Sequence, residues 1–209
     1  MKLLSFLTVI SAVLTIFFEY RYRQFIWLFK PLTMIFIIGL AFISGGRKFF
    51  YPWAILVGLV FSLIGDVFLI VPKSYFVFGL ASFLFAHIFY ATAFFKAGEG
   101  RFKFASLAAL LIGLLILALN YAGVPDALKI PVIVYAGAIS LMLCFALNLY
   151  LTKKTPESLF AMSGAFLFVV SDSILAFNKF TYEFYAAKIF ILATYFAAQW
   201  LIARSVSNA

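Results

Sequence analysis

Apolar runs of about twenty residues recur along the whole chain and decide what it can fold into. A run of this length spans the hydrocarbon core of a bilayer as an α-helix, whereas a membrane β-barrel would show shorter segments of alternating hydrophobicity. Short connections with turn-forming residues separate the runs. The sequence therefore predicts an all-α fold, a polytopic membrane helical bundle with about eight transmembrane helices. The expected segments are residues 3–18, 25–43, 53–71, 76–95, 104–121, 131–151, 159–177 and 184–203.

Composition agrees with a lipid environment. Hydrophobic residues make up 67% of the chain and charged residues 11%, whereas a soluble domain has about 45–50% apolar and about 25% charged residues. Lys2 and the apolar stretch to Phe18 resemble a signal peptide, but no small-residue cleavage site follows, so we interpret this stretch as the first span. No connection is long enough for a soluble domain. We therefore expect residues 1–209 to form a single integral-membrane domain.

The basic residues predict orientation rather than nucleic-acid binding. The net charge is +9, but the cations stand singly or in pairs between the apolar runs and form no basic stripe. An even number of spans places both termini on one side of the membrane. That side would carry nine basic residues and the other side five: Lys2, Arg47, Lys48, Lys96, Arg101, Lys103, Lys153, Lys154 and Arg204 against Arg21, Arg23, Lys73, Lys129 and Lys179. The bias predicts cytoplasmic termini, in the inner membrane if the protein is bacterial.

Two aspartates, Asp66 and Asp172, interrupt apolar runs, whereas the other five acidic residues lie in connections or at segment ends. A carboxylate at membrane depth is costly and is a functional candidate by default. Both aspartates lie about five residues before the predicted ends of helices that run in the same direction. Small residues such as Gly58 and Gly164 share their faces, so the helices can approach closely. We expect the two carboxylates to lie at one depth and to share a cavity, and a structural Asp–Lys pair is the alternative.

Other polar side chains lie within the spans and could join the aspartates. Each has a structural alternative: lysines near helix starts can extend to the interface, and a lone histidine can form an interhelical hydrogen bond. One histidine cannot build a three-histidine zinc site, although one histidine with two aspartates remains possible. The chain has no G-x-S-x-G or P-loop motif. The candidates are Lys30, His87, Tyr90, Lys188, Tyr195 and Gln199.

A weak internal repeat relates the segments 53–95 and 159–203. Asp66 precedes Lys73 by seven residues, and Asp172 precedes Lys179 by the same interval. A duplication with this spacing would be a parallel one. Two matched positions can also arise by chance in so biased a composition, so both explanations stay open.

Short motifs spread over nearly the whole chain resemble those of the YhhN family, which includes the lysoplasmalogenases. They are Lys30-Pro31-Leu32, Ser62 to Asp66 with Leu69, Gly79-Leu80 with Phe83, His87 and Tyr90, Gly164-Ala165 with Phe168, Ser171-Asp172-Ser173, and Tyr195 with Gln199. The resemblance implies an eight-helix membrane hydrolase, and we expect no metal or other cofactor. Its substrate would be a lysoplasmalogen, a single-chain phospholipid whose vinyl ether is cleaved to a fatty aldehyde and a glycerophospho-head group.

Hydrolysis of a vinyl ether suggests roles for these residues. Protonation on carbon gives an oxocarbenium ion that water captures, so one carboxyl acts as acid and the other as base or cation stabiliser, as in inverting glycosidases. Asp66 and Asp172 would be catalytic, in either order. The substrate-binding residues would be Lys30, His87, Tyr90, Ser171, Lys188, Tyr195 and Gln199. A proton-coupled transporter or lipid carrier that uses the same aspartates is the alternative. The expected partners are the substrate and membrane lipids, not nucleic acid.

Overall fold

Helices are the only regular elements in the part of the chain that the structure describes. This computed structural model describes residues 1–45, 50–71, 75–99, 107 and 121–206. Within these ranges there are seven α-helices, two 3₁₀ turns and no strand, which confirms the all-α prediction. The elements are α1 (Lys2–Arg21), η1 (Arg23–Phe25), α2 (Ile26–Ser44), α3 (Phe50–Ile70), α4 (Phe76–Ala97), η4 (Tyr121–Gly123), α6 (Asp126–Lys153), α7 (Pro156–Phe180) and α8 (Ala187–Arg204).

Most of these helices can cross a bilayer. Six spans are long and apolar enough, formed by α1, α2 with η1, α3, α4, α6 and α7. Helix α8 is 18 residues long, carries Lys188, Gln199 and Arg204, and is not among the six. The expected segment 104–121 lies outside the described residues except at its last residue and at Leu107. The predicted polytopic helical bundle is confirmed, and eight remains an approximate number of spans.

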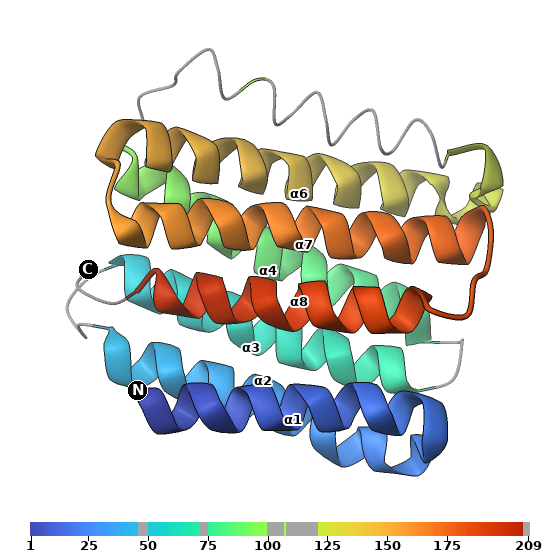
Figure 1. Cartoon of the computed structure of the whole chain (residues 1–209). Coiled ribbons are helices and arrows are strands. Elements are labelled where there is room, and N and C mark those ends of the chain that lie inside the picture. Colours follow the sequence, from blue (N-terminus) through green and yellow to red (C-terminus); the bar gives the residue numbers. More distant parts are fainter. Residues whose placement is uncertain (46–49, 72–74, 100–106, 108–120, 207–209) are drawn as a thin grey trace.

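The helices lie side by side with alternating direction (Figure 1). The most extensive packing joins α3 to α4 and α7 to α8, followed by α4 with α6 and α1 with α2. The last helix, α8, also contacts α1, α2 and α3, so it occupies the interior of the bundle. Its buried face therefore brings polar side chains from the C-terminal part of the chain to helices near the N-terminus. The start of α1 and the end of α8 lie at one end of the bundle (Figure 1).

Glycines let these helices approach closely. A Cβ added to Gly58 would lie 2.3 Å from Cε1 of Tyr90, so the α3–α4 contact depends on a bare backbone at this point. A Cβ added to Gly164 would lie 2.9 Å from the backbone oxygen of Ala198 on α8. Both contacts use small residues to join helix surfaces, as is usual in membrane proteins. The occurrence of one such glycine in each helix pair is compatible with the internal repeat, which stays a prediction.

Substituting Gly164 tests the packing of α7 on α8. Gly164→Ala places its Cβ against backbone atoms, which cannot move aside as a side chain can, and we expect a loss of about 1–3 kcal/mol in the free energy of unfolding. The measurement is thermal unfolding of the purified protein in detergent. Gly137→Ala is the matched control, because the added Cβ meets no atom within 4 Å beyond its chain neighbours and the nearby backbone of its own helix. Equal stability changes in the two variants would contradict the close α7–α8 contact.

Candidate functional site

The carboxylate of Asp66, on α3, is held from two sides in the bundle interior. The Nζ atom of Lys30, on α2, lies 2.9 Å from its Oδ1 atom. The hydroxyl of Tyr195, on α8, donates a hydrogen bond of 2.6 Å to its Oδ2 atom. The Asp66 side chain is 1% exposed and that of Lys30 13%. Buried charges are stable when they are paired and hydrogen-bonded, so the structural Asp–Lys pair considered from the sequence is present at Asp66.

A second buried polar group lies one helical turn away. The Tyr90 hydroxyl donates a hydrogen bond of 2.9 Å to Oε1 of Gln199, and Oγ of Ser62 lies 3.4 Å from the same hydroxyl. Ser62 precedes Asp66 by four residues, and Gln199 follows Tyr195 by four. The structure thus brings together four of the candidate residues, Lys30, Tyr90, Tyr195 and Gln199, around the Asp66 face of α3.

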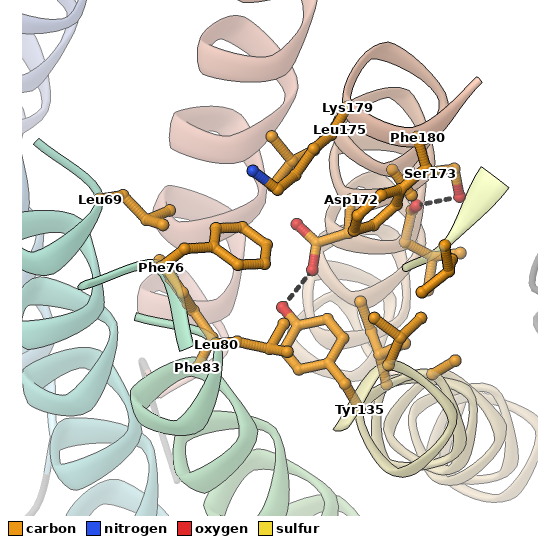
Figure 2. Close-up of a pocket in the computed structure, with 16 residues that line it drawn as sticks. Leu69, Phe76, Leu80, Phe83, Tyr135, Asp172, Ser173, Leu175, Lys179 and Phe180 are labelled. Carbon is orange, nitrogen blue, oxygen red and sulfur yellow. Dashed lines mark hydrogen bonds between the residues drawn. The ribbon is translucent and has the colours of Figure 1, made fainter. Parts of the chain in front are cut away.

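Asp172, on α7, has a different environment. It is half-buried, and its Oδ2 atom accepts a hydrogen bond from the hydroxyl of Tyr135 on α6. Figure 2 shows the carboxylate pointing into a pocket, with Phe76 on one side and Tyr135 on the other. We call this hollow the apolar pocket; among the described residues that line it, Asp172 and Lys179 are the charged ones. The full lining is Leu69, Phe76, Leu80, Phe83, Val124, Val132, Tyr135, Ala136, Ile139, Val169, Asp172, Ser173, Leu175, Ala176, Lys179 and Phe180.

A series of edge-to-face ring contacts joins the tyrosines that bind the two aspartates. The ring centroids of Tyr195 and Phe168 are 5.5 Å apart, those of Phe168 and His87 4.7 Å, and those of His87 and Tyr135 5.0 Å. Edge-to-face arrangements of this kind are favourable. Both acidic groups are therefore connected through one packed aromatic layer, which fixes the tyrosines relative to each other.

His87 lies in this layer without a hydrogen bond. It is fully buried, and neither ring nitrogen has a hydrogen-bond partner among the described residues. The interhelical hydrogen bond considered from the sequence is therefore not seen in the described structure. Nor do any three His, Cys, Asp or Glu side chains of the described residues group as a metal site, so His87, Asp66 and Asp172 do not form the three-ligand set that the sequence left open.

The two carboxylates have unequal surroundings. The aromatic layer joins their tyrosine partners, yet Asp172 lines the apolar pocket and Asp66 does not. The Phe83 ring packs on Gly65 and on Tyr195 and also lines the pocket, so it covers the side where Asp66 lies. Helix α7 extends to Phe180, so Asp172 lies eight residues before its helix ends, against four for Asp66 in α3. The pockets lined by the described residues therefore do not show the expected cavity shared by both carboxylates: Asp172 lies on the wall of the apolar pocket, and Asp66 is buried outside it.

A second hollow, which we call the charged mouth, adjoins the apolar pocket at the end of the bundle opposite the termini. The two share Leu69, Phe76, Leu175 and Lys179 as lining residues. The polar residues of the charged mouth are Glu19, Arg23, Lys30, Asn178, Lys179, Glu183 and Lys188. A path from a polar surface to an apolar interior suits a ligand with a charged head and a hydrocarbon chain.

Two predicted residues are engaged elsewhere, and two relevant residues were missed. Ser171 donates a hydrogen bond of 3.1 Å to the backbone oxygen of Ile191 and joins α7 to α8. Lys188 lines the charged mouth but forms an ion pair with Glu19. Tyr135 was missed because its partner lies on another helix. Lys179 was assigned only to a connection, although its spacing of seven residues from Asp172 was visible in the sequence.

Several known proteins are similar to this chain. The model described as the YhhN family matches residues 25–206. The chain is 37% identical over 179 residues to lysoplasmalogenase TMEM86A of Bos taurus, which covers 82% of this chain and 74% of that protein. It is 28% identical over 207 residues to the uncharacterized membrane protein YhhN of Escherichia coli O157:H7, covering 97% and 98%. A lysoplasmalogenase of Mycobacterium bovis is 34% identical over 153 residues, covering 69% and 56%. No solved structure matches the chain significantly.

Removing the Lys30 cation tests the buried pair. Lys30→Met leaves the Asp66 carboxylate buried without its counter-ion, and we expect a loss of about 3–5 kcal/mol in the free energy of unfolding. Lys188→Met removes a more exposed partner from its pair with Glu19 and should cost less than about 1 kcal/mol. Both are measured by unfolding in detergent. If the two variants lose the same stability, the Lys30–Asp66 pair is not a special constraint on the fold.

Proposed function

The chain belongs to the YhhN family, and on that basis we propose that it is a membrane-embedded hydrolase that cleaves the vinyl ether bond of lysoplasmalogens. Relatives named lysoplasmalogenase, at 37% and 34% identity, support this activity. The observation that carries the proposal is Asp172, a carboxylate on the wall of an apolar pocket that adjoins a charged mouth. The substrate would be a single-chain phospholipid, and the products a fatty aldehyde and a glycerophospho-head group.

The reaction requires a proton on carbon and a water molecule. Protonation of the double bond forms a C–H bond and leaves an oxocarbenium ion. Water adds to that ion, and the resulting hemiacetal collapses to an aldehyde and an alcohol, so one water is consumed. Two carboxyl groups can divide these tasks in the way that they do in inverting glycosidases, one as acid and the other as base or stabiliser of the cation.

In the proposed reaction, Asp172 transfers the proton. One carboxyl oxygen accepts the hydrogen bond from Tyr135, and Figure 2 shows the other oxygen turned toward the pocket. A proton on that second oxygen can pass to the substrate carbon. The Tyr135 hydrogen bond then stabilises the carboxylate that remains, since hydrogen bonds to charged groups are stronger. This carboxylate accepts a proton from the water that attacks. General acid–base catalysis of this kind contributes about 10²–10⁴-fold.

Asp66 acts through a fixed ion pair. Lys30 and Tyr195 hold its carboxylate in one place, and the aromatic layer joins Tyr195 to Tyr135, the partner of Asp172. The oriented ion pair is a fixed dipole whose carboxylate end favours the cation that forms in the reaction, because the site need not rearrange to stabilise it. Tyr90 and Gln199, which are bonded to each other, brace α4 against α8 behind Asp66, and His87 supports Tyr135 from the aromatic layer.

We also propose that the protein lies in the cell membrane with its termini in the cytoplasm. The charge bias along the sequence supports this orientation. The charged mouth lies at the opposite end of the bundle and would then open to the extracytoplasmic surface.

Cysteine labelling tests the orientation. We expect a membrane-impermeant maleimide added to intact cells to label Tyr182→Cys, since Tyr182 is 67% exposed in the α7–α8 connection at the mouth end. Lys154→Cys, in the α6–α7 connection at the terminal end, should be labelled only after the cells are opened. The wild-type protein is the control, because its Cys144 is buried. The reverse labelling pattern would place the termini outside.

Substitution of the aspartates tests the reaction. In detergent micelles, Asp172→Asn should lower the kcat for aldehyde release from a lysoplasmalogen by about 10²–10⁴-fold, with an unchanged unfolding temperature. Asp66→Asn should lower both activity and stability, because Lys30 loses its partner. Asp126→Asn is the control, since Asp126 is 95% exposed at the start of α6. A coupled assay that reduces the aldehyde with NADH gives the rate.

The same assay separates the hydrolase from the transporter or lipid carrier. Micelles hold no gradient, so turnover by the wild-type protein requires an enzyme. Wild-type protein that releases no aldehyde, but moves lipid in sealed vesicles in response to a pH difference, would overturn the proposed function. Undiminished kcat in Asp172→Asn would overturn the proposed role of that carboxyl.

A further inference from the structure

Lys179 is the cation that lines both the apolar pocket and the charged mouth. The sequence favoured Lys30 and Lys188 as residues that hold a phosphate. In the structure, Lys30 and Lys188 line the charged mouth but not the apolar pocket. Among the described residues that line the apolar pocket, Lys179 is the single cation.

The position of Lys179 on α7 directs it toward the catalytic carboxyl. It follows Asp172 by seven residues, nearly two helical turns, so the two side chains emerge from one face of the helix about 10 Å apart along its axis. Side chains in a helix tilt toward its N-terminus, which brings the ammonium group back toward Asp172. Its Nζ atom lies 3.9 Å from the centre of the Phe76 ring, and Figure 2 shows it on the side of the pocket where the Asp172 carboxylate points.

We propose that Lys179 binds the phosphate of the substrate and so sets the vinyl ether at Asp172. This inference rests on the proposed function. In a lysoplasmalogen, the three glycerol carbons and two ester or ether oxygens separate the phosphorus from the double bond by six bonds, a contour of roughly 9 Å at about 1.5 Å per bond. That contour is of the same order as the rise of about 10 Å between Asp172 and Lys179 along α7. The head group then lies in the charged mouth, and the first carbons of the chain lie deeper, beside Val169 and Ile139.

The chemistry of the lysine fits this task. An ammonium group is a compact charge with three hydrogen-bond donors and no acceptor, which suits the oxygens of a phosphate. The Phe76 ring holds the cation at the boundary between the polar and apolar hollows through a cation–π contact. Lys179 therefore acts as a specificity-determining residue that selects phosphorylated single-chain ethers over phosphate-free ones.

The test compares two substrates in detergent micelles, a lysoplasmalogen and a 1-alkenylglycerol that lacks the phosphate. We expect Lys179→Met to raise KM for the lysoplasmalogen about 10–100-fold, the range for loss of a hydrogen bond to a charged group. Its kinetics with the alkenylglycerol should equal those of the wild type. Lys179→Arg should recover most of the affinity for the lysoplasmalogen. Lys129→Met, at the same end of the bundle and paired with Asp126, is the matched control.

A second measurement keeps the test independent of the lysolipid. Glycerol 3-phosphate should inhibit cleavage of the alkenylglycerol by the wild type, and this inhibition should be lost in Lys179→Met, or in Lys179→Gln if the methionine variant does not fold. If the wild type cleaves both substrates and the Lys179 variants change neither KM nor the inhibition, the phosphate site is wrong while the hydrolase stands. If the wild type cleaves neither substrate, the proposed function fails and the inference fails with it.

Discussion

The ion pair between Lys30 and Asp66 is the constraint on which the interior of this bundle depends. A carboxylate inside a membrane protein is stable when another group compensates its charge, and here the ammonium group and the Tyr195 hydroxyl do so together. The three side chains come from α2, α3 and α8, so one buried charge ties helices from both ends of the chain. The packing of α8 in the bundle interior follows from the same requirement, because its tyrosine must reach α3.

Because of this pair, the two intramembrane aspartates have different surroundings. Asp66 is buried with two bonded partners, whereas Asp172 has one tyrosine partner among the described residues and lines a pocket. An aromatic layer of Phe168 and His87 connects the two environments. A fixed ion pair and one accessible carboxyl suit a reaction that passes through a short-lived cation. The division of labour that we propose between the aspartates rests on this asymmetry.

Part of this arrangement could be predicted from the sequence. Long apolar runs predict the helices, because the thickness of the bilayer sets their length. A carboxylate within such a run is recognised as a functional candidate, because burying its charge in the membrane is unfavourable. The stripe of small residues beside Asp66 correctly indicated close helix contacts, and the placement of Lys30 and Tyr195 near that helix was anticipated. These features depend on the spacing of residues within a single helix, and this spacing can be read directly from the sequence.

The remainder depends on how helices rotate against one another. Tyr135 looks like any aromatic residue of an apolar run until α6 packs beside α7. Ser171 is adjacent to Asp172 in sequence, but helical geometry turns it toward α8, where it bonds a backbone oxygen. The separation of the two aspartates into a buried and a pocket position likewise follows from Phe83 on α4. No pattern within one segment carries that information.

In the proposed reaction, Asp172 delivers a proton to a substrate carbon from one side of the pocket. Hydrolysis of a lysoplasmalogen in D₂O, with the aldehyde reduced as it forms and analysed by mass spectrometry and NMR, follows this proton. We expect one deuterium on the carbon next to the former aldehyde, added to a single face of the double bond. Product without this deuterium, or with deuterium divided equally between the two faces, would rule out proton delivery by Asp172.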